Sequence, residues 1–301
     1  MTIGGRLGIQ LYGKQVLSDL TLTHGSGGNL MGLPLERLGI DFIVLGGRAP
    51  GETFIDVSGG ASVVPVAASA LCVLAPKINI ITRLSPWCLK PAHIARIGAN
   101  LDRLSRGRWQ LLLDFADTSY AAVAPSMAEL SDFAFEVIDT IHGHWRGPVD
   151  HDGHFVRSVG RIVGPRPEDP LPKILIELPP EAIEYAGALS DRISGIVVES
   201  GNVKSSAGMQ DLLHSPVVVR DTTMAANAIV DTLALPADRR PIAGTADSVC
   251  DQLMDLMAKA NTGNLVVSFP ALTTNEIRLF AESLAPQLRP STTANDIGME
   301  C

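Results

Sequence analysis

The chain has 301 residues and a formal net charge of −8, and 46% of its residues are hydrophobic but only 5% aromatic. This acidic balance argues against nucleic acid as a partner, because no basic stripe is available to meet phosphates. The apolar runs are too short to span a membrane. Four cysteines without metal-ligand spacing and an N-terminus without a signal-peptide pattern indicate reduced thiols and a cytoplasmic protein.

Short apolar segments alternate with helical patterns along the whole chain. The predicted strands are residues 7–11, 42–45, 78–82, 110–113, 174–177, 195–199, 217–220 and 265–269. The clearest predicted helices are residues 94–104, 128–141, 181–189, 224–233, 246–259 and 274–284. Eight strands alternating with helices favour an α/β fold, a single (β/α)8 TIM-type barrel over residues 1–290. A doubly wound open sheet is the alternative, disfavoured because no glycine-rich phosphate turn follows the first strand.

Residues 143–172 interrupt this alternation before the fifth strand. They are rich in Gly, Pro, His and Asp, which predicts an irregular excursion with a small hairpin around Asp152 and Gly153. His142, His144, His151 and His154 lie in or beside it and could hold zinc or iron, but we expect a solvated hairpin and no metal. Residues 291–301 are predicted to be a loose tail.

The stretch KPAHIARIGANLDRLSRGRWQLLL, residues 90–113, is the most informative one. Pro91 suits a first helical turn, and apolar residues then recur at helical spacing. Gly107 is placed to end the helix in a left-handed cap, before a short apolar strand. The residues that carry a wider pattern are Pro91, Ala95, Arg96, Leu101, Asp102, Leu104, Ser105, Gly107 and Arg108.

This pattern resembles the helix-plus-strand signature of the bacterial luciferase-like family of flavin-dependent monooxygenases. Further similarities are "LGIDFIVL" at 38–45, "GPVDHDGHF" at 147–155, the segment 242–270 and "IRLFAESLAPQLR" at 277–289. The nearest branch is that of the alkanesulfonate and dimethylsulfone monooxygenases. The resemblance implies reduced FMN or a deazaflavin in the barrel mouth, a small organic substrate, a dimer joined by helices of the first half, and a flavin reductase or a homologous subunit as partner.

In such a barrel the active site lies at the carboxyl ends of the strands. We therefore name Tyr12, His93 and Asp114 as catalytic candidates. The cofactor-binding candidates are Gly46, Thr82, Arg83, Glu177 and Arg220. The two arginines are predicted to anchor an anionic group, because a guanidinium matches carboxylate, sulfonate or phosphate.

Three strand ends depart from the family pattern. The family holds the flavin phosphate on backbone N–H groups after the fifth strand, in a Gly-Gly-Ser type sequence. This chain has Glu177-Leu178-Pro179-Pro180 there, and the prolines remove two donors. Strand four has Leu111 to Ala116 in place of Asn-Val-Val-Thr-Gly, and His214-Ser215-Pro216 stands near the family's Arg-x-His.

Three hypotheses follow from these patterns. The first is a luciferase-like flavin- or deazaflavin-dependent oxidoreductase, leaning to a monooxygenase. The second is a relative without catalysis, either a supporting subunit or a ligand-binding barrel. The third is a cofactor-free enzyme that uses Asp114 and Glu177 as an acid–base pair. The glycine-rich segment 25–29 is expected to be a mobile loop over the barrel mouth rather than a phosphate cradle.

Overall fold

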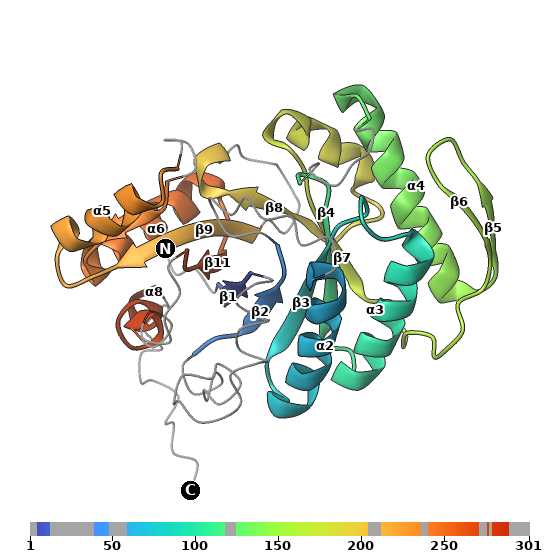
Figure 1. The fold of residues 1–301 in the computed structure, drawn as a ribbon, viewed down its shortest axis with the longest axis horizontal. Coiled ribbons are helices and arrows are strands. Elements are labelled where there is room, and N and C mark those ends of the chain that lie inside the picture. The colour runs from blue at the N-terminus through green and yellow to red at the C-terminus, as the bar shows by residue number, and fades with distance from the viewer. Residues whose placement is uncertain are drawn as a thin grey trace, which may run out of the picture.

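The computed structural model describes residues 5–12, 39–47, 59–117, 125–203, 212–235, 240–270, 276 and 279–288. The core is a closed barrel of eight parallel strands, as predicted (Figure 1). The strands are β1 (Leu7–Leu11), β2 (Phe42–Leu45), β3 (Asn79–Leu84), β4 (Trp109–Asp114), β7 (Lys173–Glu177), β8 (Gly195–Glu199), β9 (Leu212–Val219) and β11 (Asn264–Ser268). Pairing of β8 with β9 closes the ring.

The two faces of each strand bury different apolar sets, which explains the unbroken apolar runs in the sequence. Side chains that alternate along the strands fill the barrel interior in one cluster, formed by Phe42, Val44, Ile81, Leu112, Leu175, Val197, Leu212 and Val266. Gly8 leaves room for the Phe42 ring, because a Cβ there would lie 2.2 Å from it. The opposite faces pack against the helices in a second, larger cluster.

The helices follow the strands on the outside of the barrel (Figure 1). They are α2 (Gly59–Leu74), α3 (Pro91–Ser105), α4 (Met127–Arg146), η3 (Pro180–Leu189), η4 (Ser200–Asn202), α5 (Thr223–Thr232), α6 (Ala246–Ala260), η6 (Phe280–Leu284) and α8 (Ala285–Leu288). Among the described residues, no helix is long and apolar enough to cross a membrane.

The helix α3 begins at Pro91, as its sequence predicts. Its left-handed cap is Arg106, at φ 57°, and Gly107 follows with φ 77°. Gly107 donates a backbone hydrogen bond to Asp102 O at 3.1 Å, so Arg106 and Gly107 together end the helix. Gly98 on this helix faces Trp109 of β4, where a Cβ would lie 2.6 Å from the indole ring.

The seventh strand differs from its prediction. It begins at Leu212, not at residue 217, and its first half closes the barrel against β8 and β11. Residues 217–219 extend beyond the barrel and pair with a short extra strand, β10 (Ile242–Gly244). Pro216 lies inside this strand, where proline is unfavourable, and the predicted strand, which began after it, left out the inward-facing His214.

The excursion before the fifth strand contains the predicted hairpin, β5 (Val149–Asp152) with β6 (Arg157–Gly160). Glu136 of α4 fixes its turn, because its carboxylate accepts the backbone N–H groups of His154, Phe155 and Val156 at 2.8 to 2.9 Å. Partial burial raises the pKa of Glu136, but these bonds outweigh it and lower that pKa. The predicted loop at 25–29 and the predicted tail lie outside the described residues.

Candidate active site

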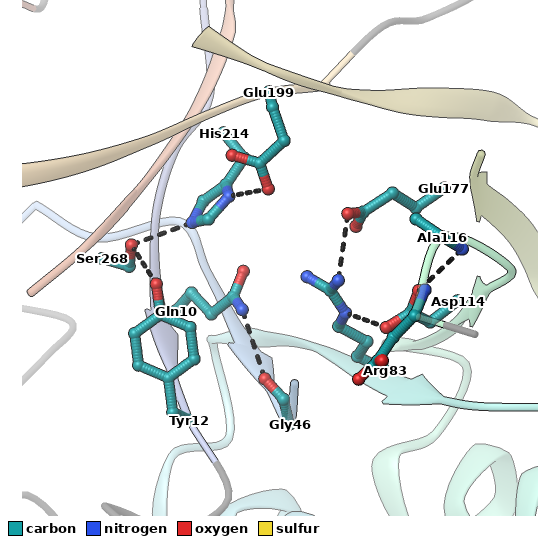
Figure 2. A network of polar contacts seen from close by, with 11 residues as sticks. Gln10, Tyr12, Gly46, Arg83, Asp114, Ala116, Glu177, Glu199, His214 and Ser268 are labelled. Atoms are coloured by element: carbon teal, nitrogen blue, oxygen red, sulfur yellow. Dashed lines mark hydrogen bonds and ion pairs between the residues drawn. The ribbon is translucent and has the colours of Figure 1, made fainter. Parts of the chain in front are cut away.

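Polar side chains collect inside the barrel at the carboxyl ends of its strands (Figure 2). Alternation along the strands explains this, because the positions two residues beyond the inner apolar cluster point the same way. Thus Arg83 follows Ile81, Asp114 follows Leu112 and Glu177 follows Leu175. The same rule places Glu199, His214 and Ser268 inward on β8, β9 and β11.

Arg83, Asp114 and Glu177 form one group, here called the arginine cluster. The guanidinium donates from Nε to Asp114 Oδ2 and from Nη2 to Glu177 Oε1, each at 2.9 Å. The other Asp114 oxygen accepts the backbone N–H groups of Ala116 and Asp117 at 3.0 Å. The fork geometry of the guanidinium therefore fixes Arg83 between two carboxyl groups, and the carboxylate of Asp114 balances its positive charge.

Glu177 is the member of this cluster whose protonation is unusual. Burial raises the pKa of Glu177 to about 8, and the carboxylates of Asp114 and Glu199 add to this rise against the opposing effect of Arg83. Because Oε1 accepts from Arg83, the proton belongs on Oε2. That oxygen is buried and has no hydrogen-bond partner among the described residues. Glu177 can therefore offer a hydrogen bond to a ligand at neutral pH.

A second group, here called the histidine chain, crosses the mouth beside the arginine cluster (Figure 2). His214 Nδ1 lies 2.6 Å from Glu199 Oε1, and His214 Nε2 lies 2.9 Å from Ser268 Oγ. Tyr12 then donates its hydroxyl to Ser268 Oγ at 2.7 Å. Burial raises the pKa of Tyr12 far above its usual value, so this phenol stays protonated.

Gln10 and two glycines lie between the two groups. Gln10 Nε2 donates to Gly46 O at 3.2 Å, at the end of β2. Gly46 and Gly47 both have positive φ, 110° and 86°, which favours glycine. A Cβ on Gly46 would lie 2.7 Å from Arg83 O, so this backbone must stay bare to pass the arginine cluster.

The structure brings five of the predicted residues together: Tyr12, Gly46, Arg83, Asp114 and Glu177. It places the other three elsewhere. The Thr82 hydroxyl faces outward and accepts the Trp109 indole N–H at 3.0 Å. His93 is exposed on α3, and Arg220 pairs with Glu276 at 2.6 Å beyond the barrel end of β9.

The site residues that were not among the named candidates are Gln10, Glu199, His214 and Ser268, although Glu199 and Ser268 lie at the ends of the strands predicted at 195–199 and 265–269. Strand alternation was the signal that could have found them, since each lies two residues from an inward-facing position.

Around the hairpin, His144 Nε2 lies 2.8 Å from Ser158 Oγ, and His151 lies 3.6 Å from Glu136. Within the described part of the chain, no three metal-ligating side chains gather.

The turn after β7 does not fit a phosphate. It consists of Leu178, Pro179 and Pro180, and η3 begins at Pro180. Both prolines lack an N–H, and the N–H of Ala182 is used by Pro179 O at 2.9 Å. The carboxyl group of Glu177 lies at the same strand end. The mouth itself fits an uncharged, hydrogen-bonding ring system better, because Glu177 Oε2 needs an acceptor there.

Comparison with known proteins gives this geometry a context. The family model described as luciferase-like monooxygenase matches residues 33–195. None of the curated proteins matches the chain. Monooxygenase RslO1 from Streptomyces bottropensis is 19% identical, with a TM-score of 0.65 over 93% of this chain and 99% of its own.

Two further structures share the fold. An F420-dependent secondary alcohol dehydrogenase, solved with an F420-acetone adduct, is 14% identical with a TM-score of 0.70. The alignment covers 96% of this chain and 100% of that one. The F420-dependent tetrahydromethanopterin reductase from Methanopyrus kandleri is 15% identical, with a TM-score of 0.65 over 95% and 99% of the two chains. At these identities the similarity concerns the fold.

Proposed function

Because the chain belongs to the luciferase-like monooxygenase family, we propose that it is a flavin- or deazaflavin-dependent oxidoreductase that acts on a small organic substrate. The observation that carries this proposal is the pair of polar groups at the barrel mouth. The arginine cluster and the histidine chain lie side by side at the barrel mouth and together offer hydrogen-bond donors and acceptors there (Figure 2). A barrel that only bound ligands would not need buried groups of this kind, so the catalytic hypothesis is favoured over a relative without catalysis.

The cofactor supplies the redox chemistry when bound, and the chain supplies contacts and protons. Glu177 Oε2 would donate to an acceptor atom of the ring. The guanidinium of Arg83 would hold Glu177 and Asp114 in place rather than anchor an anion, since both carboxylates already occupy it. Tyr12 and the histidine chain would handle a substrate proton.

The choice between FMN and a deazaflavin, and between monooxygenation and dehydrogenation, belongs to this proposal. The similar structures include enzymes named for both chemistries, RslO1 as a monooxygenase and the alcohol dehydrogenase as F420-dependent. We keep the monooxygenase as the first hypothesis because the matching family model describes that activity. The alkanesulfonate and dimethylsulfone branch stays a prediction, because the two arginines expected to anchor its anion, Arg83 and Arg220, are both paired with carboxyl groups.

Asp114 and Glu177 do lie together, as a cofactor-free acid–base pair would require. However, Arg83 stands between them and binds one oxygen of each. We therefore assign the two carboxyl groups to the cofactor site.

We also propose a dimer, in line with the family resemblance. The helix α2 of the first half of the barrel exposes Val66, Val73 and Leu74 to 60–69%. These residues recur at helical spacing, so they form one apolar stripe. A second copy of the chain would cover it. A flavin reductase or a homologous subunit remains the expected partner for a cofactor that must be supplied reduced.

The proposed function is tested by titrating the protein with oxidised FMN and, separately, with oxidised F420. Binding of an isoalloxazine or deazaflavin ring in the mouth changes its visible absorption. A saturable change at one ring per chain with either cofactor supports the proposal. No change with either, in oxidised or reduced form, would reject it.

A further inference from the structure

The histidine chain connects the barrel interior with solvent. Tyr12 and Ser268 are buried, with exposures of 2% and 0%. The His214 side chain is 5% exposed, and that of Glu199 is 38% exposed. Ser268 and Glu199 are the last residues of β11 and β8, Tyr12 follows β1, and His214 is the third residue of β9, so the closed barrel fixes their order in space. The path therefore runs from the buried Tyr12 and Ser268 to the partly solvent-exposed Glu199.

The hydrogen bonds in this path have one direction. We assign a hydrogen to His214 Nδ1, because the Glu199 carboxylate that it faces accepts and does not donate. His214 Nε2 is then an acceptor, and Ser268 must donate to it. The Ser268 oxygen in turn accepts the Tyr12 hydroxyl hydrogen. In each hydrogen bond of the histidine chain, the donor thus lies on the Tyr12 side and the acceptor on the Glu199 side.

We propose that Tyr12, Ser268, His214 and Glu199 form a proton-accepting relay, which takes a proton from a hydroxyl group of the substrate. This inference deepens the proposed function, on which its substrate class rests. The substrate O–H bond breaks and its electron pair stays on oxygen, while the proton passes to Tyr12 Oη. The Tyr12 proton moves to Ser268 Oγ, and the Ser268 proton moves to His214 Nε2. Glu199 balances the resulting imidazolium.

Such a relay differs from a nucleophilic serine triad, which has a similar Ser-His-Glu order. In a triad the serine itself attacks the substrate, whereas here Tyr12 is the terminal group and Ser268 lies between Tyr12 and His214. Its oxygen also accepts the Tyr12 hydroxyl, which reduces its nucleophilic character. The raised pKa of Tyr12 agrees with a group that passes a proton on without storing a negative charge.

The direction of the relay is tested by nitrogen NMR of the protein labelled with ¹⁵N-histidine, without cofactor. The chain has seven histidines, and His214→Gln identifies the signal of interest. The relay predicts a hydrogen on Nδ1, with a far-downfield proton that Glu199→Gln moves upfield. A resting imidazole with its hydrogen on Nε2 would overturn the proposal.

The connection is tested by the exchange of the Tyr12 hydroxyl, again without cofactor, so that failure of the proposed function does not affect it. With ¹³Cζ-tyrosine in an equal mixture of H2O and D2O, a fast-exchanging hydroxyl gives one averaged line and a slow one gives two. The relay predicts one line for the wild type and two for Ser268→Ala and Glu199→Gln. The Tyr12→Phe variant assigns the signal.

The matched control is Ser215→Ala. Like Ser268, Ser215 is a buried serine, and it lies on β9 next to His214. Its hydroxyl has no partner among the described residues and is not part of the histidine chain. The Ser215→Ala variant should keep the single averaged line of Tyr12. Two lines in the wild type, or one line in both relay variants, would overturn the relay. So would covalent labelling of Ser268 by a fluorophosphonate, since this would identify a nucleophile.

Discussion

Arg83 Nη2 lies 2.9 Å from Glu177 Oε1, and the two side chains are only 11% and 6% exposed. The same guanidinium holds Asp114 at 2.9 Å. One cation thus compensates two buried carboxyl groups at the mouth of the barrel. Removing a partner from a buried ion pair leaves an uncompensated charge, which is more costly than the pair itself is stabilising.

The first prediction concerns Arg83→Met, which keeps most of the stem but removes the charge. We expect the free energy of unfolding to fall by about 3–5 kcal/mol, the usual cost of breaking a buried pair. Urea unfolding measures it. The matched control is Arg103→Met, whose pair with Glu168 is half exposed and should change stability by about 0–1 kcal/mol. Equal losses in both variants would contradict this account of the cluster.

The second prediction concerns the pH dependence of stability. The pKa of Glu177 is raised to about 8 in the folded chain, above its value in the unfolded chain. Its contribution is therefore fully present at pH below the unfolded pKa and is lost as the pH rises through about 8. The wild type should lose stability relative to Glu177→Gln over this window. If the wild type instead gains stability relative to Glu177→Gln as the pH rises, Arg83 keeps Glu177 ionised in the folded chain, which contradicts this prediction.

The third prediction concerns the phosphate of FMN. Each charge-assisted N–H contact to a phosphate contributes about 1.5–3 kcal/mol, and Pro179 and Pro180 supply none. We expect calorimetry to give affinities for FMN and for phosphate-free riboflavin that agree within about tenfold. FMN binding tighter than riboflavin by about two orders of magnitude or more would show that another part of the chain binds the phosphate.

The fourth prediction concerns the dimer. A charged residue in the apolar stripe of α2 would be buried without a partner in the interface. The double variant Val66→Glu and Val73→Glu should therefore have the mass of one chain by light scattering, where the wild type has the mass of two. Met224→Glu is the control, because Met224 is also exposed, to 82%, but lies on α5. A wild type that is monomeric would contradict the proposal.

Much of the fold followed from local patterns in the sequence. Apolar runs and helical spacing depend on a few neighbouring residues, and the strand ending at Glu177 and the helix beginning at Pro91 were predicted on this basis. The limits of β9 were not, because Pro216 interrupts the pattern within a strand that pairs on both sides. Its pairing depends on β11 and β10, which are distant in sequence.

Some residues of the site were predicted from the sequence, and others were not. Arg83, Asp114 and Glu177 lie at or directly after the ends of the strands predicted at 78–82, 110–113 and 174–177, so their charged side chains were identified. The direction of a side chain was harder to predict. Thr82 and Arg83 are neighbours, but only Arg83 faces the interior, while Thr82 meets Trp109 outside. His214 was missed as a site residue because the start of its strand was unclear, and its partner Ser268 is 54 residues away.

The most direct test of the central claim is an experimental structure of the protein with FMN or F420 bound. The account predicts that the ring lies in the barrel mouth between the arginine cluster and the histidine chain, with an acceptor atom at Glu177 Oε2. It also predicts that no phosphate oxygen is bound by the backbone at Pro179 and Pro180. A ring bound outside the mouth, or a phosphate seated at the start of η3, would contradict it.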